Sequence, residues 1–139
     1  MSLFRVLIGL ILLQVGVQSC TQKPADTSDA AGLFMEKTTS IEFFQKEHSF
    51  GILKSNKLVS HYFKFQNTGK ENLIILETKA SCNCTVPKVP NYPVKPNKMD
   101  SILVEFDPTG QKGIQYKTVR IYTNTIPVVH TLRFKAEIM

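Results

Sequence analysis

Hydrophobic and polar side chains alternate along most of this chain. From residue 41 onward the alternation recurs in short runs, and no run shows the three-to-four-residue spacing of an amphipathic helix. Alternation with a period of two is typical of strands that have one buried and one solvated face, so we expect an all-β protein. In the run "KLVSHYFKFQ", for example, one face carries Val59, His61, Phe63 and Phe65.

About seven short strands follow from this pattern, separated by turn-forming segments. In the turn "NTGKEN", Asn67 and Gly69 are suited to positive φ, and "PTGQKG" marks a later turn. Short strands with one apolar face each favour an antiparallel β-sandwich. The expected strands cover residues 41–44, 49–53, 57–66, 73–78, 100–107, 116–124 and 128–138.

The expected core consists of apolar side chains that share a face within each strand. Such a core is large enough to support about 100 folded residues. Its members are Phe63, Phe65, Leu73, Ile75, Ile102, Val104, Phe106, Val119, Ile121, Leu132 and Phe134.

The first twenty residues have the pattern of a targeting segment. "MSLFRVLIGLILLQVGVQSC" has one charge, at Arg5, followed by an apolar run that is too short to span a bilayer as a helix. The run ends in "VQSC", which resembles the lipobox of bacterial lipoproteins, with Gln18 where a small or aliphatic residue is usual. The resemblance implies cleavage of a signal peptide and lipidation of Cys20. An ordinary secretory signal or a plain membrane anchor is the alternative.

The polar segment "TQKPADTSDAAG" follows the expected lipidation site. Small and polar residues dominate it, which is typical of a flexible linker. We therefore divide the chain into a signal peptide at 1–19, a lipid-anchored tether at 20–37 and one β-sandwich domain at 38–139.

Composition and charge narrow the classes of function. The chain has 139 residues, 42% of them hydrophobic and 20% charged, which fits one ordinary globular domain. Its net charge of +6 becomes +5 when the leader containing Arg5 is removed. The lysines are scattered, without a run of five basic residues, and export also disfavours a nucleic-acid partner. A mild basic charge beside an anionic membrane is a more ordinary interpretation.

Three segments carry a family resemblance: "HYFKFQNTGKENLII", "KASCNCTVPKVPNYPVKPN" and "ILVEFDPTGQKGIQYKTVRIYTN". In order and spacing they resemble the domain of unknown function 1573 family, over roughly residues 38–138. The family consists of exported bacterial proteins, common in Bacteroidetes. The resemblance therefore implies an immunoglobulin-like sandwich akin to the Hydin-like domains. The family has no assigned activity, so the resemblance implies little about function.

This chain departs from the family pattern at two places. Asn83 stands between the cysteines where glycine is usual, and Asn97 follows Pro96 where proline–glycine is usual. Asparagine is the residue next best able to adopt positive φ, so both departures keep the expected backbone.

The pair Cys82 and Cys84 has several interpretations. The two side chains share one face of an extended strand, so a disulfide between them requires a bend, which Asn83 would permit. Such a small, strained ring would be easily reduced, although the compartment beyond the inner membrane is oxidising. Two thiolates could also bind copper(I), whereas zinc would need further ligands that the spacing does not supply. The remaining interpretation is structural: the pair ends a strand and fixes the following loop.

The sequence contains no catalytic motif that we recognise. A catalytic thiol needs an activating base or a helix N-terminus. His61 and His130 lie on strand faces that are expected to be buried, where a histidine is more often packed than reactive. We therefore predict no catalytic residue, no metal site and no cofactor.

The segment "VPKVPNYPVKP" contains four prolines. Proline at this density is not expected to pair in a strand ladder, and it favours a stiff, extended, exposed loop. Tyr92 lies in the middle of this segment and is a candidate partner contact; the alternative is that it folds back on the sandwich.

These observations favour a lipid-anchored binding or scaffolding module of the bacterial cell envelope without catalytic activity. We expect it on the outer rather than the inner membrane, facing the periplasm. Its partners would be the membrane, through the lipid on Cys20, and an envelope protein or polysaccharide, with no nucleic acid. The alternative is a thiol–disulfide or copper-handling protein that uses Cys82 and Cys84.

Overall fold

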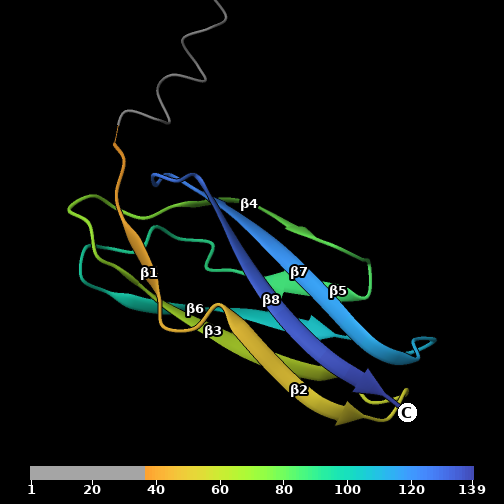
Figure 1. Cartoon of the computed structure of the whole chain (residues 1–139). Coiled ribbons are helices and arrows are strands. Elements are labelled where there is room, and N and C mark those ends of the chain that lie inside the picture. The colour runs from red at the N-terminus through yellow and green to blue at the C-terminus, as the bar shows by residue number, and fades with distance from the viewer. Residues whose placement is uncertain (1–36) are drawn as a thin grey trace, which may run out of the picture.

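A computed structural model describes residues 37–139 and contains eight β-strands (Figure 1). The expected signal peptide, Cys20 and nearly all of the expected tether lie outside the described residues. Within residues 37–139, no helix is long and apolar enough to cross a membrane. The strands are β1 (Ile41–Phe43), β2 (Glu47–Leu53), β3 (Val59–Asn67), β4 (Ile75–Ala80), β5 (Thr85–Lys88), β6 (Met99–Phe106), β7 (Gly113–Thr123) and β8 (Val129–Ile138).

The strands form two four-stranded sheets that pack face to face as a sandwich (Figure 1). One sheet has the strand order β1-β3-β6-β5 and the other β2-β8-β7-β4. The predicted all-β, immunoglobulin-like sandwich is confirmed, with one departure from an antiparallel arrangement. Strand β2 pairs parallel to β8, while the other strand pairs are antiparallel. Alternation shows which face of a strand is buried but not its direction, so the sequence could not reveal this pair.

The unexpected strand, β5, lies inside the proline-rich segment. Pro87 stands opposite Val104 of β6, so the expectation that prolines here stay out of a ladder is wrong for Pro87. Strand β5 is at the edge of its sheet, where proline is tolerated because one side of the strand has no partner. Pro90, Pro93 and Pro96 lie outside the strands, as expected.

The core lies between the inner faces of the two sheets. Every predicted core residue except Ile75 is buried, and Ile75 packs half-buried against the others. The rings of Phe106 and Phe134 join the two sheets with centroids 5.1 Å apart. Each large apolar side chain buried here contributes about 1.5–3 kcal/mol relative to its exposed state. The core also includes Phe43, Val94, Ala136 and Ile138, which were not among the predicted members.

The sandwich has two ends along the direction of its strands. The asparagine end comprises residues 37–40, the turns at 67–73 and 124–128, and the loop at 89–98. The disulfide end comprises the β4–β5 corner at 81–84 and the turns at 54–58 and 107–112. The described chain begins at the asparagine end, beside the β7–β8 turn, and the β4–β5 corner lies on the far side of the molecule (Figure 1).

Candidate functional site

The corner between β4 and β5 contains the cysteine pair. Cys82 and Cys84 are joined by a disulfide, with their Cα atoms 5.2 Å apart, and Asn83 between them is exposed. The corner carries the chain from an edge strand of one sheet to an edge strand of the other. The pair therefore lies where the chain changes sheet, which fits the loop-fixing interpretation. Its redox role stays a prediction.

Hydrogen bonds hold both sides of this corner. The Thr85 amide donates to the Cys82 carbonyl at 3.2 Å, and the Asp107 amide donates to the Cys84 carbonyl at 2.9 Å. The Thr85 hydroxyl lies 3.3 Å from Cys82 Sγ. Both cysteines are half-buried, and Cys84 packs against the core. The corner is thus part of the packed sandwich rather than a loose loop.

A buried asparagine at the opposite end was not among the predicted site residues. Asn67 is completely buried, and its side-chain amide donates to the carbonyls of Glu71 and Val94 at 2.7 and 2.8 Å. Its side-chain oxygen accepts from the Thr39 hydroxyl at 2.8 Å and the Gly69 amide at 3.1 Å. Alternation gave a usable signal here, because Asn67 continues the buried face of Phe63 and Phe65 and must therefore find partners inside.

The turn that follows Asn67 is built differently from the prediction. Neither Asn67 nor Gly69 has positive φ, so that expectation is wrong. Glycine is needed at 69 for space, because a Cβ there would lie 2.1 Å from the Thr39 hydroxyl oxygen and 2.5 Å from the Ser40 amide nitrogen. Positive φ occurs at Asn97, with φ 61°, which confirms the expected role of asparagine after Pro96. Asn83 does not have positive φ, so the same expectation is wrong between the cysteines.

A second buried asparagine holds two segments of this end together. The side-chain amide of Asn124 donates to the carbonyls of Lys37 and Asn72 at 3.0 and 2.9 Å. Its side-chain oxygen accepts from the Ile74 amide at 2.8 Å. Both asparagines lie in the segments that carry the family resemblance, and the structure gives them a structural role rather than a chemical one.

The loop around Tyr92 is anchored at this same end. Leu73 and Val94 exchange two backbone hydrogen bonds of 2.9 Å, which hold the middle of the loop against the segment that leads into β4. Tyr92 is 58% exposed, and its hydroxyl donates to the Asp100 carboxylate at 2.8 Å. This hydrogen bond and the Asp100 charge raise the pKa of Tyr92. Tyr92 is thus both exposed and fixed, and its contact with a partner stays a prediction.

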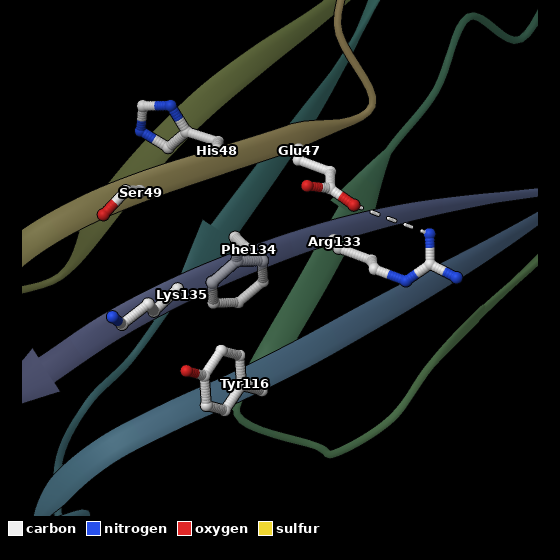
Figure 2. A pocket seen from close by; sticks show the side chains of 7 residues that line it. All are labelled: Glu47, His48, Ser49, Tyr116, Arg133, Phe134 and Lys135. Atoms are coloured by element: carbon white, nitrogen blue, oxygen red, sulfur yellow. Dashed lines mark ion pairs between the residues drawn. The ribbon is translucent and has the colours of Figure 1, made fainter.

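A groove of about 480 Å³ crosses the outer face of the sheet β2-β8-β7-β4 (Figure 2). Two cross-strand rows form it. Tyr116 and Ser49 flank Lys135 in one row, and Glu47 lies opposite Arg133 in the other. The central strand β8 has hydrogen-bonded neighbours on both sides, so the floor of the groove is rigid. None of these residues was a predicted site residue, because exposed polar positions on a strand carry no sequence signal of their own.

The charged side chains of the groove make only weak interactions with their neighbours. Arg133 Nη1 lies 3.9 Å from Glu47 Oε1, and both side chains are more than half exposed. Exposed ion pairs of this kind contribute about 0–1 kcal/mol, so the pair can separate readily for a ligand. Lys135 Nζ lies 5.9 Å from the ring centroid of Tyr116, which is 72% exposed. The groove therefore offers an aromatic ring and two cations at its surface.

Two histidines stack beside this groove, and His48 is one of the residues that line it. The rings of His48 and His61 lie 3.6 Å apart with an interplanar angle of 9°, joining β2 of one sheet to β3 of the other. Burial lowers the pKa of both, and the charge of His48 lowers that of His61 further. His130 is buried with its Nε2 2.8 Å from the Thr125 hydroxyl, so it is packed as expected. In the part of the chain that the structure describes, no three potential ligand side chains gather to hold a metal ion.

Comparison with solved structures shows the fold at low sequence identity. A crystal structure of a protein of unknown function from Porphyromonas gingivalis W83 matches with TM-score 0.64 and 18% identity, over 73% of this chain and 47% of that one. The VesB protease of Vibrio cholerae matches with TM-score 0.56 and 12% identity, over 78% and 34%.

A third match is the CsuC–CsuE chaperone–tip adhesion subunit pre-assembly complex of Acinetobacter baumannii, with TM-score 0.52 and 9% identity, over 70% and 56%. This chain thus spans about half or less of the length of the first two structures. Identities this low show that the sandwich fold is shared, but they do not show that this chain has the activity of any of these proteins.

No curated protein matches the chain. A family described as "Protein of unknown function (DUF1573)" matches residues 41–138, which include all eight strands. The match confirms the resemblance carried by the asparagine, cysteine and strand motifs, and the chain belongs to the DUF1573 family.

Proposed function

We propose that this chain is a binding or scaffolding module of the bacterial cell envelope, held to the membrane by lipid and without catalytic activity. The groove formed around Tyr116, Lys135 and Arg133 is the observation that carries this proposal. Its floor is a paired central strand, so little ordering is needed when a partner binds. An exposed aromatic ring beside two weakly held cations is typical of a contact surface.

The position of the histidines supports a non-catalytic role. His48 and His61 are stacked on each other, and His130 is closed in by Thr125. A general base must lie within hydrogen-bond reach of the proton it removes, with an open position for the substrate. A stacked pair and a buried ring are poorly suited to that task.

A pull-down from envelope extract tests the binding role. The full-length protein, purified from membranes in non-ionic detergent, is compared with its Tyr116→Ser variant. We expect the variant to lose most of the recovered partner and to keep its folding transition, since the side chain is exposed. Tyr62→Ser is the matched control, because Tyr62 is also exposed but lies on the other sheet. Equal recovery by both variants would rule out the groove as the binding site.

Lipid attachment at Cys20 rests on the lipobox-like "VQSC". A Cys20→Ala variant should lose acyl labelling and stay unprocessed. Unchanged labelling in this variant would refute the lipoprotein assignment. Separation of inner and outer membranes then tests the expected location on the periplasmic side of the outer membrane.

A thiol–disulfide role is the second candidate, and the bonded pair at the β4–β5 corner is the observation that favours it. In such a role a partner dithiol would reduce the bond between Cys82 and Cys84 and would itself become a disulfide, leaving two thiols here. Copper(I) could bind only after that reduction. The half-burial of both sulfur-bearing residues opposes fast exchange.

Thiol titration of the native protein before and after mild reductant separates the two roles. A pair that opens under mild reductant, together with a lost redox or copper phenotype in a folded Cys82→Ser, Cys84→Ser variant, would favour the second candidate. Unchanged partner recovery and redox response in that variant would favour the binding module.

A further inference from the structure

We infer that the groove is one end of a longer binding surface for an acidic polysaccharide, a chain of sugars that bear carboxylates. This inference rests on the proposed function, because it names the class of partner for the same groove. The surface follows the outer face of β7 and its neighbours β8 and β4. We call it the tyrosine–cation face, and it consists of Tyr116, Tyr122, Lys79, Arg120, Arg133 and Lys135.

The two tyrosines mark the length of this face. Tyr116 and Tyr122 lie on the same side of β7, with Arg120 between them on that side. Six residues of strand span about 20 Å, which suits an extended oligomer rather than a single small molecule. A lysine stands over each ring: Lys135 Nζ is 5.9 Å from the Tyr116 centroid and Lys79 Nζ is 5.2 Å from the Tyr122 centroid. The pattern of ring and cation thus repeats at the two ends of the face.

The cations between the rings are available to a ligand. Among residues 37–139, neither Arg120 nor Lys135 takes part in an ion pair. Arg133 meets Glu47 at 3.9 Å across two exposed side chains, so a ligand carboxylate can replace Glu47. Arginine presents a planar fork that binds a carboxylate through two parallel hydrogen bonds.

The charge of the domain supports an anionic partner. Residues 37–139 contain fifteen lysines and arginines against eight aspartates and glutamates, an excess of seven positive charges. Glu77 pairs with Lys79 at 3.2 Å and Glu47 with Arg133 at 3.9 Å, so both offset part of the charge of this face, as does Glu137 at its end. Long-range attraction from the whole domain would therefore bring an acidic chain to the surface, and the side chains of the face would select its position.

A polysaccharide fits this face better than an extended peptide. Peptides commonly bind a sheet by adding a strand at a free edge. Strands β7 and β8 are paired on both sides, so their backbone groups are not free for a peptide. Along β7 and β8 the face offers side chains alone: two tyrosine rings and three cations, joined by Lys79 of the edge strand β4 and by the hydroxyls of Ser49, Thr118 and Thr131. Rings and polar groups of this kind can meet the faces and hydroxyls of sugars along an extended chain.

Binding to polygalacturonate tests the inference. The full-length protein in non-ionic detergent is titrated with polygalacturonate, with the same polymer fully methyl-esterified, and with poly-L-glutamate of similar length. We expect binding to polygalacturonate that weakens as salt is added, and no binding to the uncharged ester. Equally tight binding to poly-L-glutamate, with the same sensitivity to the variants below, would overturn the assignment to polysaccharide.

Matched variants separate this face from general charge attraction. Arg133→Gln should weaken binding about tenfold, since a charge-assisted bidentate contact is lost. Tyr116→Ser should weaken it by a smaller factor. Lys64→Gln removes the same charge from an exposed position on the other sheet and should leave the affinity unchanged. Equal loss in Lys64→Gln and Arg133→Gln would overturn the inference, because binding would then follow net charge alone.

The outcomes distinguish this inference from the proposed function. If polygalacturonate does not bind but Tyr116→Ser still loses its partner in the envelope pull-down, the inference is wrong and the binding module stands. If Tyr116→Ser changes neither the binding of polygalacturonate nor the recovery of a partner in the pull-down, the inference and the proposed binding site are both wrong. Recovery of an acidic protein through the groove would likewise overturn the polysaccharide assignment and leave the proposed function in place.

Discussion

At the asparagine end of the sandwich, two buried side-chain amides hold segments that are far apart in the sequence, whereas at the disulfide end a covalent bond joins two cysteines of a single corner. Asn67 contacts Thr39 and Val94, 28 and 27 residues away. Asn124 contacts Asn72 and Lys37, 52 and 87 residues away. The disulfide spans a sequence separation of only 2.

The difference shows that bond strength and contribution to stability are separate quantities. A covalent link across two residues removes little freedom from the unfolded chain, because those residues are neighbours in any state. The Asn67 amide satisfies four backbone or hydroxyl groups, and its removal deprives each of that partner, although the Val94 carbonyl keeps the Leu73 amide. We therefore expect the noncovalent end to be the more sensitive to substitution.

Replacement of Asn67 should have the largest effect. Asn67→Ala should lower the free energy of unfolding by about 3–4 kcal/mol, since each buried group left without a partner costs about 1–3 kcal/mol. Chemical denaturation measures the loss. Thr68→Ala is the control, because Thr68 is exposed in the same turn, and it should change stability by less than about 0.5 kcal/mol. A loss below that of the disulfide variant would reverse the comparison between the two ends.

Substitution of the neighbouring glycine should have the next largest effect. Gly69→Ala places a Cβ 2.1 Å from the Thr39 hydroxyl oxygen, so the segment that contacts Asn67 must move. We expect a loss of about 1–3 kcal/mol, the range for overpacking. A wild-type midpoint in the denaturation curve would show that the N-terminal segment of the domain can shift freely, and that this end is less tightly packed than described.

Removal of the disulfide should cost less. Cys82→Ser with Cys84→Ser should lower the free energy of unfolding by about 1 kcal/mol, because the closed ring is very small and hydrogen bonds around the corner remain. Cys82→Ala with Cys84→Ala is a useful companion, since it avoids placing hydroxyls against the core. If either double substitution lowers the free energy of unfolding as much as Asn67→Ala, the corner contributes more to stability than the size of the disulfide ring predicts.

The smallest effect concerns acid pH and the stacked histidines, which lie in neither end. Because burial lowers the pKa of His48 and His61 below 6.5, the unfolded chain binds more protons as the pH falls. Stability should therefore decrease from about pH 6.5 toward the folded-state pKa values and then level off. Denaturation midpoints between about pH 8 and about pH 4 measure this loss.

His130 also contributes to the acid effect, so a variant must separate it from the stacked pair. Burial and the charge of Lys46 also lower the pKa of His130, so it contributes in the same direction. A His48→Gln, His61→Gln variant should show a shallower loss at acid pH than the wild type. The remainder is due to His130 and, toward about pH 4, to Asp107, whose pKa is lowered by its hydrogen bonds with Thr109. If the stability of that variant falls with pH as steeply as that of the wild type, the pKa values of His48 and His61 are the same in the folded and unfolded states.

Much of the fold was predictable because alternation records which face of a strand is buried. Phe63 and Phe65, for example, lie on a buried face in both the sequence pattern and the structure. The direction of β2 and the pairing of Pro87 were not predictable, since they depend on which strand lies next to each. The role of Asn67 was open to prediction as a polar residue on an apolar face, but its partners were not.

The candidate site was far less predictable than the fold. Tyr92 and the cysteine pair stood out in the sequence because proline and cysteine have marked backbone and bonding properties. Tyr116, Arg133 and Lys135 did not, because an exposed tyrosine or a cation on a strand is ordinary by itself. Only cross-strand register places them side by side.

By itself, the sequence determined the all-β class, the buried faces of most strands, the family membership and the expectation of a lipid anchor. These are local properties: alternation, turn residues and short motifs act between neighbours in the chain. Tertiary structure decided the parallel edge strand, the asparagine contacts, the histidine stack and the tyrosine–cation face. Each of these joins residues from segments distant in sequence, and such contacts exist only once the sheets have paired and packed.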